Sequence, residues 1–224
     1  MSAQGNLPDG SDDADLGLIE TLLWVEDKRF FLIDEHLARL ARSAAALGFA
    51  HDGDTVVRCL EEAVVGRRAP RLRVRLILDR SGRCSVSAQP IDPMPAETVW
   101  RVAVATTRFT SDDPLLQHKT TRRGIYENAL AEASVRNGAQ EVLFLNEREE
   151  LCEGARSNIF IMRNGNLLTP PLACGVLPGT LRARLLEEGR AREATLRMAD
   201  LSPNCQWYMG NSVRGLVRAC LIGD

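Results

Sequence analysis

Segments with strand periodicity and segments with helical periodicity interleave irregularly along this chain of 224 residues. Basic and apolar residues alternate over 71–79, which is typical of a half-buried strand. After Asp34, apolar residues recur every three or four positions, which is typical of a helix. The order has no regular strand–helix–strand rhythm, and no glycine-rich phosphate loop follows a strand, so a Rossmann or P-loop fold is not expected. The pattern predicts a mixed α/β (α+β) protein with two lobes.

The first lobe is expected over 16–108, behind a flexible polar tail over 1–15. It opens with a hairpin that turns at 26–28, and the helix that follows is predicted to be capped by Asp34 and ended by Gly48. The predicted elements are strands over 18–25 and 29–33, helices over 35–47 and from Asp54 or Thr55 to about 65, and strands over 71–79, 84–89 and 101–105.

A polar segment over 109–114 is interpreted as the linker to the second lobe, which is expected over 115–224. In that lobe the pair Asn164-Gly165 is a strong signal for a tight hairpin turn. The predicted elements are a helix over 124–137, a strand over 141–146, hairpin strands over 158–163 and 166–168, a helix over 180–192, and closing strands over 206–209 and 216–221.

Net charge, the length of apolar runs and cysteine spacing argue against several kinds of partner and site. The net charge is −2 and the basic residues are spread along the chain, so no nucleic-acid partner is expected. No segment is apolar over about 18 residues, and the first residues lack a signal-peptide pattern, which leads us to expect a cytoplasmic protein with no membrane partner. The six cysteines form no C-x-x-C pair, so we expect reduced thiols rather than disulfides, and no metal site.

Lysine is nearly absent from the chain. Of its 28 basic residues, only Lys28 and Lys119 are lysines, and an arginine-rich coding bias is the simplest explanation. Under such a bias, a remaining lysine is expected where arginine cannot replace it. A buried amine can lose its proton and form an imine, whereas a guanidinium stays protonated. Lys119 is therefore either an exposed lysine ahead of a helix or an imine-forming amine.

Three further positions combine polar chemistry with an unusual setting. Glu153 lies between apolar residues and a glycine, so it is either a solvated turn residue or a buried anion that holds a protonated ring nitrogen. The run 177–182 opens a helix whose free backbone N–H groups could bind a phosphate. The turn at 210–212 could do the same, whereas Arg39, taken alone, is expected to be a solvated arginine.

Five segments taken together resemble the class IV aminotransferase family, which comprises the fold-type IV pyridoxal-phosphate enzymes. The resemblance covers the chain from about Leu18 to its end, and the part from Glu153 to Gly179 is the most specific. The five segments are His36-Leu37-x-Arg39-Leu40-x-x-Ser43-Ala44, His118-Lys119-Thr120-Thr121, Glu153-Gly154-x-x-Ser157-Asn158-Ile159-Phe160, Leu168-Thr169-Pro170-Pro171 and Leu177-Pro178-Gly179.

The resemblance implies two α/β lobes, as in D-amino acid and branched-chain aminotransferases, with pyridoxal 5'-phosphate between them and a homodimer as the usual assembly. It implies that Lys119 forms the Schiff base with the cofactor and serves as general base, and that Glu153 pairs with the pyridine nitrogen. The residues implied in cofactor binding are Arg39, Lys119, Glu153, Ser157, Asn158, Thr180, Leu181, Asn211 and Ser212.

Within the family, the runs 118–121 and 210–216 most resemble the 4-amino-4-deoxychorismate lyases, which release pyruvate and 4-aminobenzoate for folate biosynthesis. Thr21 stands where many aminotransferases of the family carry a glycine, and its hydroxyl could protonate the leaving group. The alternative is an aminotransferase for branched-chain or D-amino acids, which would share every cofactor residue. Thr21 argues against that alternative, as does Leu23, which stands where some members carry an arginine.

A third hypothesis is a binding or regulatory protein that kept the fold and lost catalysis. The presence of both Lys119 and Glu153 argues against it. The small-molecule amino substrate also needs a partner for its carboxylate. Arg75 and Arg123 are candidates for that role, although either could be a surface arginine.

Overall fold

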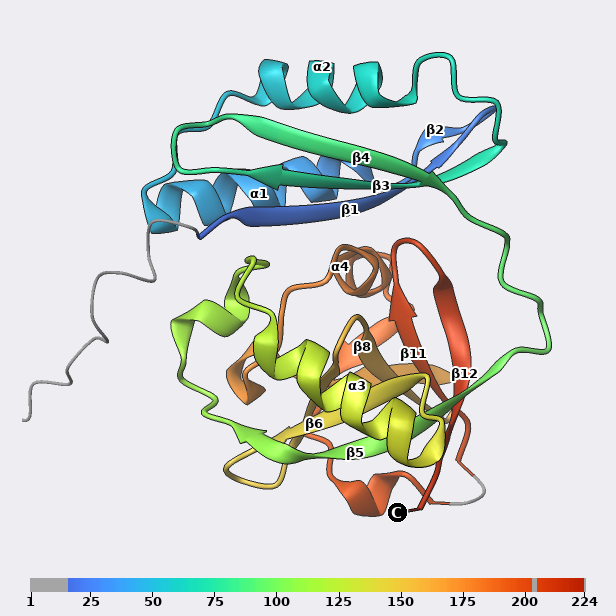
Figure 1. The fold of residues 1–224 in the computed structure, drawn as a ribbon. Helices are drawn as coiled ribbons and strands as arrows, with labels where there is room; N and C mark the ends of the chain where they lie inside the picture. Colours follow the sequence, from blue (N-terminus) through green and yellow to red (C-terminus); the bar gives the residue numbers. More distant parts are fainter. Residues whose placement is uncertain (1–15, 203–204, 224) are drawn as a thin grey trace, which may run out of the picture.

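The computed structural model describes residues 16–202 and 205–223, so the tail expected over 1–15 lies outside the described part of the chain. The described residues form the predicted mixed α/β fold in two lobes, each with its own sheet (Figure 1). The first lobe contains a four-stranded antiparallel sheet in the order β2-β1-β3-β4. Its elements are β1 (Leu18–Val25), β2 (Arg29–Phe30), α1 (Ile33–Leu47), α2 (Gly53–Val64), β3 (Arg71–Leu78) and β4 (Cys84–Pro90).

The alternation in β1 and β3 divides the small sheet into two faces. Leu22 and Val74 are paired across the two strands and are fully buried in a core that includes Leu40 from α1 and Leu60 from α2. The neighbouring pair, Thr21 of β1 and Arg75 of β3, lies on the opposite face because successive strand residues point to opposite sides. This opposite face contributes to the space between the lobes.

The second lobe contains an eight-stranded sheet in the order β10-β9-β8-β11-β12-β5-β6-β7. Because β7 also pairs with β8, six of these strands close into a ring. The elements are β5 (Val99–Phe109), η1 (Pro114–Gln117), α3 (Gly124–Asn137), β6 (Glu141–Asn146), β7 (Leu151–Gly154), β8 (Asn158–Arg163), β9 (Asn166–Thr169), η2 (Leu172–Cys174), α4 (Thr180–Glu187), β10 (Ala191–Glu193), η3 (Met198–Asp200), β11 (Trp207–Asn211) and β12 (Gly215–Leu221).

Three predicted elements of the first lobe differ in the structure. The strand expected over 29–33 ends at Phe30, because Leu32 adopts a left-handed conformation (φ 56°) and α1 begins at Ile33. Asp34 therefore lies inside the first turn and is not the cap, although its charge there still suits the helix dipole. The second helix is capped by Asp52, whose carboxylate accepts a hydrogen bond from the Asp54 N–H.

The second lobe also differs from prediction at the end of α4, at the unpredicted strands β7 and β10, and at the segment over 109–114. The helix expected over 180–192 ends at Glu187, where Gly189 adopts a positive φ of 67° and the Arg190 N–H donates to the Leu185 carbonyl. The chain then forms β10 along β9, a strand that was not predicted. The segment over 109–114 does not join the lobes, because β5 pairs with β6 and β12 and Phe109 is buried. The crossing between the sheets follows β4 instead (Figure 1).

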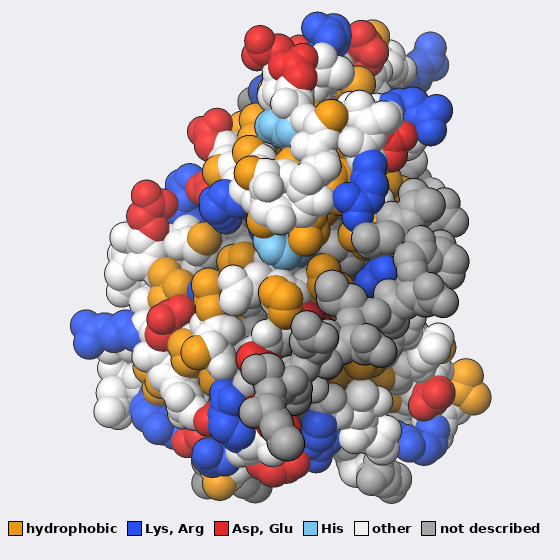
Figure 2. Space-filling model, turned by 90° about the vertical axis from the view of Figure 1, so that its left-hand side faces the viewer, with side chains coloured by type: hydrophobic (Ala, Val, Ile, Leu, Met, Phe, Trp, Pro, Cys, Tyr) orange, Lys and Arg blue, Asp and Glu red, His pale blue; other side chains and the backbone are white. Residues whose placement is uncertain are grey.

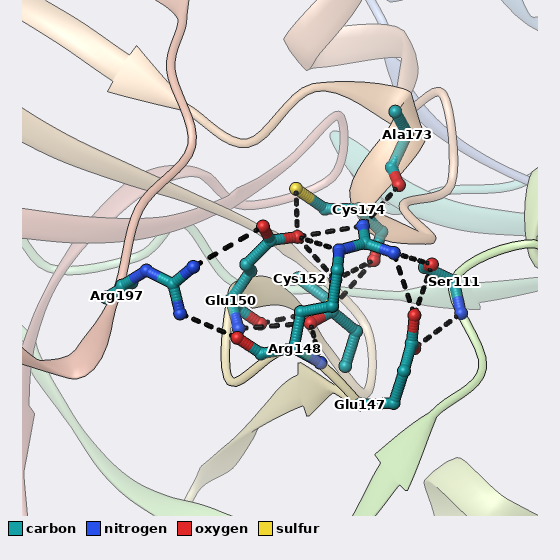
Figure 3. Close-up of polar contacts among 9 residues, drawn as sticks. Ser111, Glu147, Arg148, Glu150, Cys152, Ala173, Cys174 and Arg197 are labelled. Carbon is teal, nitrogen blue, oxygen red and sulfur yellow. Dashed lines mark hydrogen bonds and ion pairs between the residues drawn. The ribbon is translucent and has the colours of Figure 1, made fainter.

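A network of charged side chains fixes the turn between β6 and β7 (Figure 3). Glu150 is buried and accepts hydrogen bonds from Arg148 Nε at 3.0 Å and from the Cys174 thiol at 3.5 Å. Arg148 also donates to the Ser111 hydroxyl, and Arg197 Nη2 lies 3.7 Å from Glu150 Oε1. We call this set the Glu150 network. It ties the β6–β7 turn to the loop that follows β5 and to η2.

The outer surface has no strong preference for one sign of charge on the face drawn in Figure 2. Acidic and basic side chains are interspersed there with apolar ones. Among the described residues, no helix combines the length and the apolar character needed to cross a membrane.

Candidate active site

A cavity of about 860 Å³ lies between the two lobes. Its wall contains all ten residues that the sequence analysis singled out as catalytic or cofactor-binding, together with both arginines considered for the substrate carboxylate. Nine basic residues line it, against four acidic ones. The cavity is therefore strongly electropositive, in contrast to the mixed surface in Figure 2. The ten residues are Thr21, Arg39, Lys119, Glu153, Ser157, Asn158, Thr180, Leu181, Asn211 and Ser212.

Backbone pairing to β1 positions Lys119. The Ile19 N–H donates to the Lys119 carbonyl at 2.7 Å, and Thr120 forms a bridge to Leu18. One residue further on, Gly17 and Thr121 exchange hydrogen bonds through the Thr121 hydroxyl and backbone. The segment 119–121 thus behaves as a short extra strand at the edge of the small sheet, and it holds Lys119 in the cavity wall. The segment comes from the second lobe, so Lys119 is fixed by both.

The amine of Lys119 has no hydrogen-bond partner among the described residues, although protein surrounds the side chain. Burial lowers its pKa to about 7, and the positive charges of Arg123 and Arg39 act in the same direction. Glu20 and Glu153 partly oppose this shift. A large fraction of the amine is therefore unprotonated near neutral pH, which a nucleophile or a general base requires.

Glu153 is the buried anion that the sequence suggested as one of two possibilities. Its side chain is 4% exposed, and burial raises its pKa to about 7. Three donors contact the carboxylate: the Leu177 N–H at 3.1 Å, the Tyr126 hydroxyl at 3.1 Å and the Asn158 amide at 3.4 Å. No arginine or lysine forms a salt bridge with it among the described residues. A buried carboxylate of this kind can accept a bond from a cationic group that enters the cavity.

Two backbone features near the start of α4 favour an anionic group. The N–H groups of Thr180 and Leu181 have no partner among the described residues, and no side chain caps the helix. Glycine is required at position 179, since a Cβ atom there would lie 1.9 Å from Asn158 Oδ1. Unpaired N–H groups and the helix dipole together attract phosphate and carboxylate groups.

Arg39 is buried, contrary to its expected solvation, because Glu20 neutralises it. Arg39 Nε and Nη2 lie 2.9 and 2.6 Å from the two Glu20 oxygens, and Nη1 donates to the Pro178 carbonyl at 3.2 Å. His36 Nδ1 lies 2.5 Å from the same carboxylate, and its Nε2 lies 3.0 Å from the Ser212 hydroxyl and 3.2 Å from that of Thr180. This set links α1 to the start of α4 and to the β11–β12 turn.

Burial acts to raise the pKa of Glu20, but the charge of Arg39 and the hydrogen bonds from His36 and Arg39 lower it to about 2. Glu20 therefore stays ionised throughout the physiological range. The role of Glu20 was not predicted, because an acidic residue in a predicted strand gives no signal that His36 and Arg39 of α1 will contact it.

Ser157 and Asn211 lie in the cavity wall but are engaged with the protein. The Ser157 hydroxyl donates to Glu141 at 3.0 Å, and the Asn211 side chain closes the β11–β12 turn by accepting from the Val213 and Arg214 N–H groups. Glu141 is buried and also accepts from the Ala155 and Arg156 N–H groups, so it shapes the turn between Glu153 and Asn158. Burial raises the pKa of Glu141.

Thr21 and Arg75 face each other across β1 and β3 at the cavity. Neither the Thr21 hydroxyl nor the Arg75 guanidinium has a hydrogen-bond partner among the described residues. Burial lowers the pKa of Arg75, and the nearby charge of Arg123 adds to this effect. Arg123 itself is held by the Ala155 carbonyl and by the ring of Tyr126. An unpaired arginine beside a second arginine is a natural partner for a carboxylate.

Comparison with known proteins points to the same family that the five sequence segments resemble. Residues 17–222 match the family model described as Amino-transferase class IV. A Schizosaccharomyces pombe protein provisionally named aminodeoxychorismate lyase is 31% identical over 210 residues, which cover 92% of this chain and 89% of that protein. A Mycobacterium tuberculosis protein named bifunctional aminodeoxychorismate lyase / D-amino acid transaminase is 29% identical and covers 83% of this chain, with 74% of its own length matched.

Among solved structures, a Mesorhizobium loti protein provisionally named amino-acid aminotransferase superposes with a TM-score of 0.88. It is 47% identical in sequence, and the match covers 93% of this chain and 100% of the other.

Proposed function

The chain belongs to the amino-transferase class IV family, and from that premise we propose that it is a pyridoxal-phosphate-dependent 4-amino-4-deoxychorismate lyase that releases pyruvate and 4-aminobenzoate. Members of this family are pyridoxal-phosphate enzymes that act as lyases or aminotransferases, so the chain is an enzyme of one of these two kinds. The homodimer that is usual for the family is part of the proposal.

The described residues fit the cofactor. The unpartnered amine of Lys119 suits the aldehyde, and Glu153 suits a protonated ring nitrogen. The free N–H groups of Thr180 and Leu181, with Arg39 and Ser212 beside them, suit the phosphate. The excess of basic residues in the cavity wall also suits the phosphate and a substrate with two carboxylates.

When bound, pyridoxal phosphate withdraws electrons from the carbon that carries the substrate amine. Lys119 would then take the proton from that carbon. Its pKa of about 7 leaves the amine free to accept a proton at neutral pH and to return it later. The backbone bond from Ile19 fixes the residue, so the amine reaches the substrate through its own side-chain rotations.

Glu153 would hold the positive charge on the ring nitrogen. Since Glu153 is buried away from bulk solvent, this carboxylate would act more strongly there than it would in water. The Leu177 N–H and the Tyr126 hydroxyl fix its orientation.

Thr21 is the observation that carries the lyase proposal over transamination. Its hydroxyl has no partner among the described residues and lies at the same cavity as Lys119. It can donate a proton to the ether oxygen as the bond between that oxygen and the ring carbon breaks, so that the oxygen leaves with the enolpyruvyl group. Transamination has no leaving group that needs protonation.

The test is direct. Purified protein loaded with pyridoxal phosphate is mixed with 4-amino-4-deoxychorismate, without any keto acid, and both products are followed. Equal release of pyruvate and 4-aminobenzoate is expected, because elimination needs no amino acceptor. The absence of both products from cofactor-bearing protein would contradict the lyase proposal.

An aminotransferase acting on branched-chain or D-amino acids is the second candidate. The observation in its favour is the 47% identity to the Mesorhizobium loti protein, together with the double name of the Mycobacterium tuberculosis relative. Every residue proposed above for the cofactor would serve it equally well. Amino-acid donors with 2-oxoglutarate as acceptor test it, and a chain with both activities would produce both sets of products.

A further inference from the structure

Each oxygen of the Glu153 carboxylate has its own fixed donor. Oε1 accepts the Tyr126 hydroxyl at 3.1 Å. Oε2 accepts the Leu177 N–H at 3.1 Å and, more weakly, the Asn158 amide at 3.4 Å. Leu177 donates through its backbone N–H, so a substitution of its side chain cannot remove this hydrogen bond. Tyr126 is therefore the only side chain among the described residues that donates to Oε1.

The ring of Tyr126 is held firmly. It packs edge-on against Phe109 and Phe144, with centroids 5.4 Å away in both cases, and these two rings stack on each other at 4.6 Å. The guanidinium of Arg123 covers the ring 4.9 Å from its centroid. Tyr126 lies on the first turns of α3, only a few residues beyond Lys119. Its hydroxyl therefore has little freedom to leave Glu153.

We propose that Tyr126 is a positioning residue that fixes the plane of the Glu153 carboxylate and favours its ionised form, so that Glu153 can hold a cationic ring nitrogen. The role of Glu153 toward a ring nitrogen rests on the proposed function. The action of Tyr126 on Glu153 does not depend on it. No covalent step is involved, since Tyr126 donates a hydrogen bond and keeps its proton. Burial and the nearby Glu153 charge both raise the pKa of Tyr126, so the phenol stays protonated.

Several groups face Glu153 and set its ionisation together. Lys119 and Arg123 act on it by charge, the Leu177 N–H and Tyr126 by hydrogen bonds, and Cys152 precedes it on β7 as a buried thiol. Burial raises the pKa of Glu153, whereas the Leu177 N–H, Lys119, Tyr126 and Arg123 lower it. Loss of the Tyr126 bond should therefore raise the pKa of Glu153 by about one unit.

The experiment uses cofactor-free protein labelled with ¹³C at the glutamate carboxyls. The Glu153 resonance is assigned by its loss in Glu153→Gln, and its chemical shift is followed against pH. In Tyr126→Phe, which keeps the ring, the titration midpoint should move up by about one pH unit from its wild-type position. The matched control is Tyr208→Phe, which removes the hydroxyl of the only other tyrosine and should leave the midpoint unchanged. An unchanged midpoint in folded Tyr126→Phe would overturn the proposal.

A second variant covers the case in which Tyr126→Phe does not fold. In the Tyr208→Phe background, growth on 3-fluorotyrosine labels Tyr126 alone. Fluorination makes the phenol a stronger donor, so the Glu153 midpoint should move down. A midpoint that does not move would again contradict the proposal.

The cofactor-loaded protein provides the remaining readout. In Tyr126→Phe, the pH dependence of the absorption of bound pyridoxal phosphate should shift in the same direction as the Glu153 midpoint, while Tyr208→Phe should match wild type. If the protein releases neither pyruvate nor 4-aminobenzoate but the Glu153 midpoint responds to Tyr126, the lyase proposal fails and the positioning role stands. If the products appear and the midpoint does not respond, only the positioning role fails.

Discussion

Two of the places where the molecule buries charge, the Glu150 network and the Lys119–Glu153 pair in the cavity, affect ionisation in opposite ways. In the Glu150 network, Arg148 and Asn146 donate to the carboxylate, and these bonds lower the pKa of Glu150 to about 2 (Figure 3). In the cavity, burial dominates, and it moves the pKa values of Lys119 and Glu153 to about 7 from opposite sides. The first cluster is fully ionised at neutral pH, and the second is poised to gain or lose protons.

This difference separates structural from chemical use of buried charge. A carboxylate paired with arginine and amide donors stabilises a turn and cannot exchange protons near neutrality. A buried amine without a partner costs stability, but it supplies a reactive group. The predictions below alter one cluster at a time.

Removal of the cavity amine should have the largest effect. We expect Lys119→Ala to lower lyase turnover by a factor of at least about 10²–10⁴, the range of a lost general base. The fold should survive, because the amine has no protein partner to lose. The control is Lys28→Ala, which removes the only other lysine, an exposed residue of the β1–β2 turn. Turnover close to wild type in Lys119→Ala would refute the assignment.

Neutralising the cavity anion should have the next largest effect. In Glu153→Gln the shape is kept, but the charge that would hold the ring nitrogen is lost, so we expect turnover to fall by about 10². Wild-type activity should fall as pH drops through the Glu153 pKa of about 7, because the carboxylate then becomes protonated. Glu26→Gln, in the exposed β1–β2 turn, is the control for loss of one acidic group. A pH profile in Glu153→Gln identical to wild type would argue against this role.

Arg75→Gln should affect substrate binding more than the chemical step. If Arg75 binds a substrate carboxylate, its loss should raise KM by about 10- to 150-fold with little change in kcat, since a charge-assisted bond of this kind contributes about 1.5–3 kcal/mol. Arg83→Gln is the control, because Arg83 is an exposed arginine beside the β3–β4 turn, paired with Asp79. A fall in kcat without a change in KM would place Arg75 outside the carboxylate site.

Glu150→Gln should affect stability and leave activity largely intact. The variant weakens bonds from Arg148 and Asn146, so we expect the free energy of unfolding to fall by about 1–3 kcal/mol in chemical denaturation. Because the pKa of Glu150 is lower in the folded state, its contribution is present above pH 4.5 and is lost as pH falls toward 2. The acid limb of wild-type stability should therefore flatten in the variant. Equal stability of the two proteins across this range would contradict the comparison.

The sequence indicated the candidate residues better than their environment. Lys119 was singled out by the scarcity of lysine and Glu153 by its apolar neighbours, each with an alternative left open, and the structure places both in the cavity wall. The burial of Arg39 was not predicted, since it depends on Glu20, which lies on another element. Tyr126 was missed for the same reason, because its bond to Glu153 joins α3 to β7.

The predicted helices and strands were likewise correct where the sequence signal was local. The helix Gly124–Asn137 was predicted with its exact bounds, since Gly138 gives a clear end signal. The crossing between lobes was misplaced, because β5 continues to Phe109 through pairing with strands far along the chain. Local periodicity cannot register such pairing.

The most direct test of the account is to find which amine reacts with the cofactor. The protein is mixed with pyridoxal phosphate, reduced with borohydride and digested, and the modified peptide is identified by mass spectrometry. The chain has only two lysines, so the result is unambiguous. We predict the phosphopyridoxyl group on Lys119 and none on Lys28. Modification of Lys28 alone, or of neither lysine, would contradict the claim that the unpaired cavity amine is the reactive group.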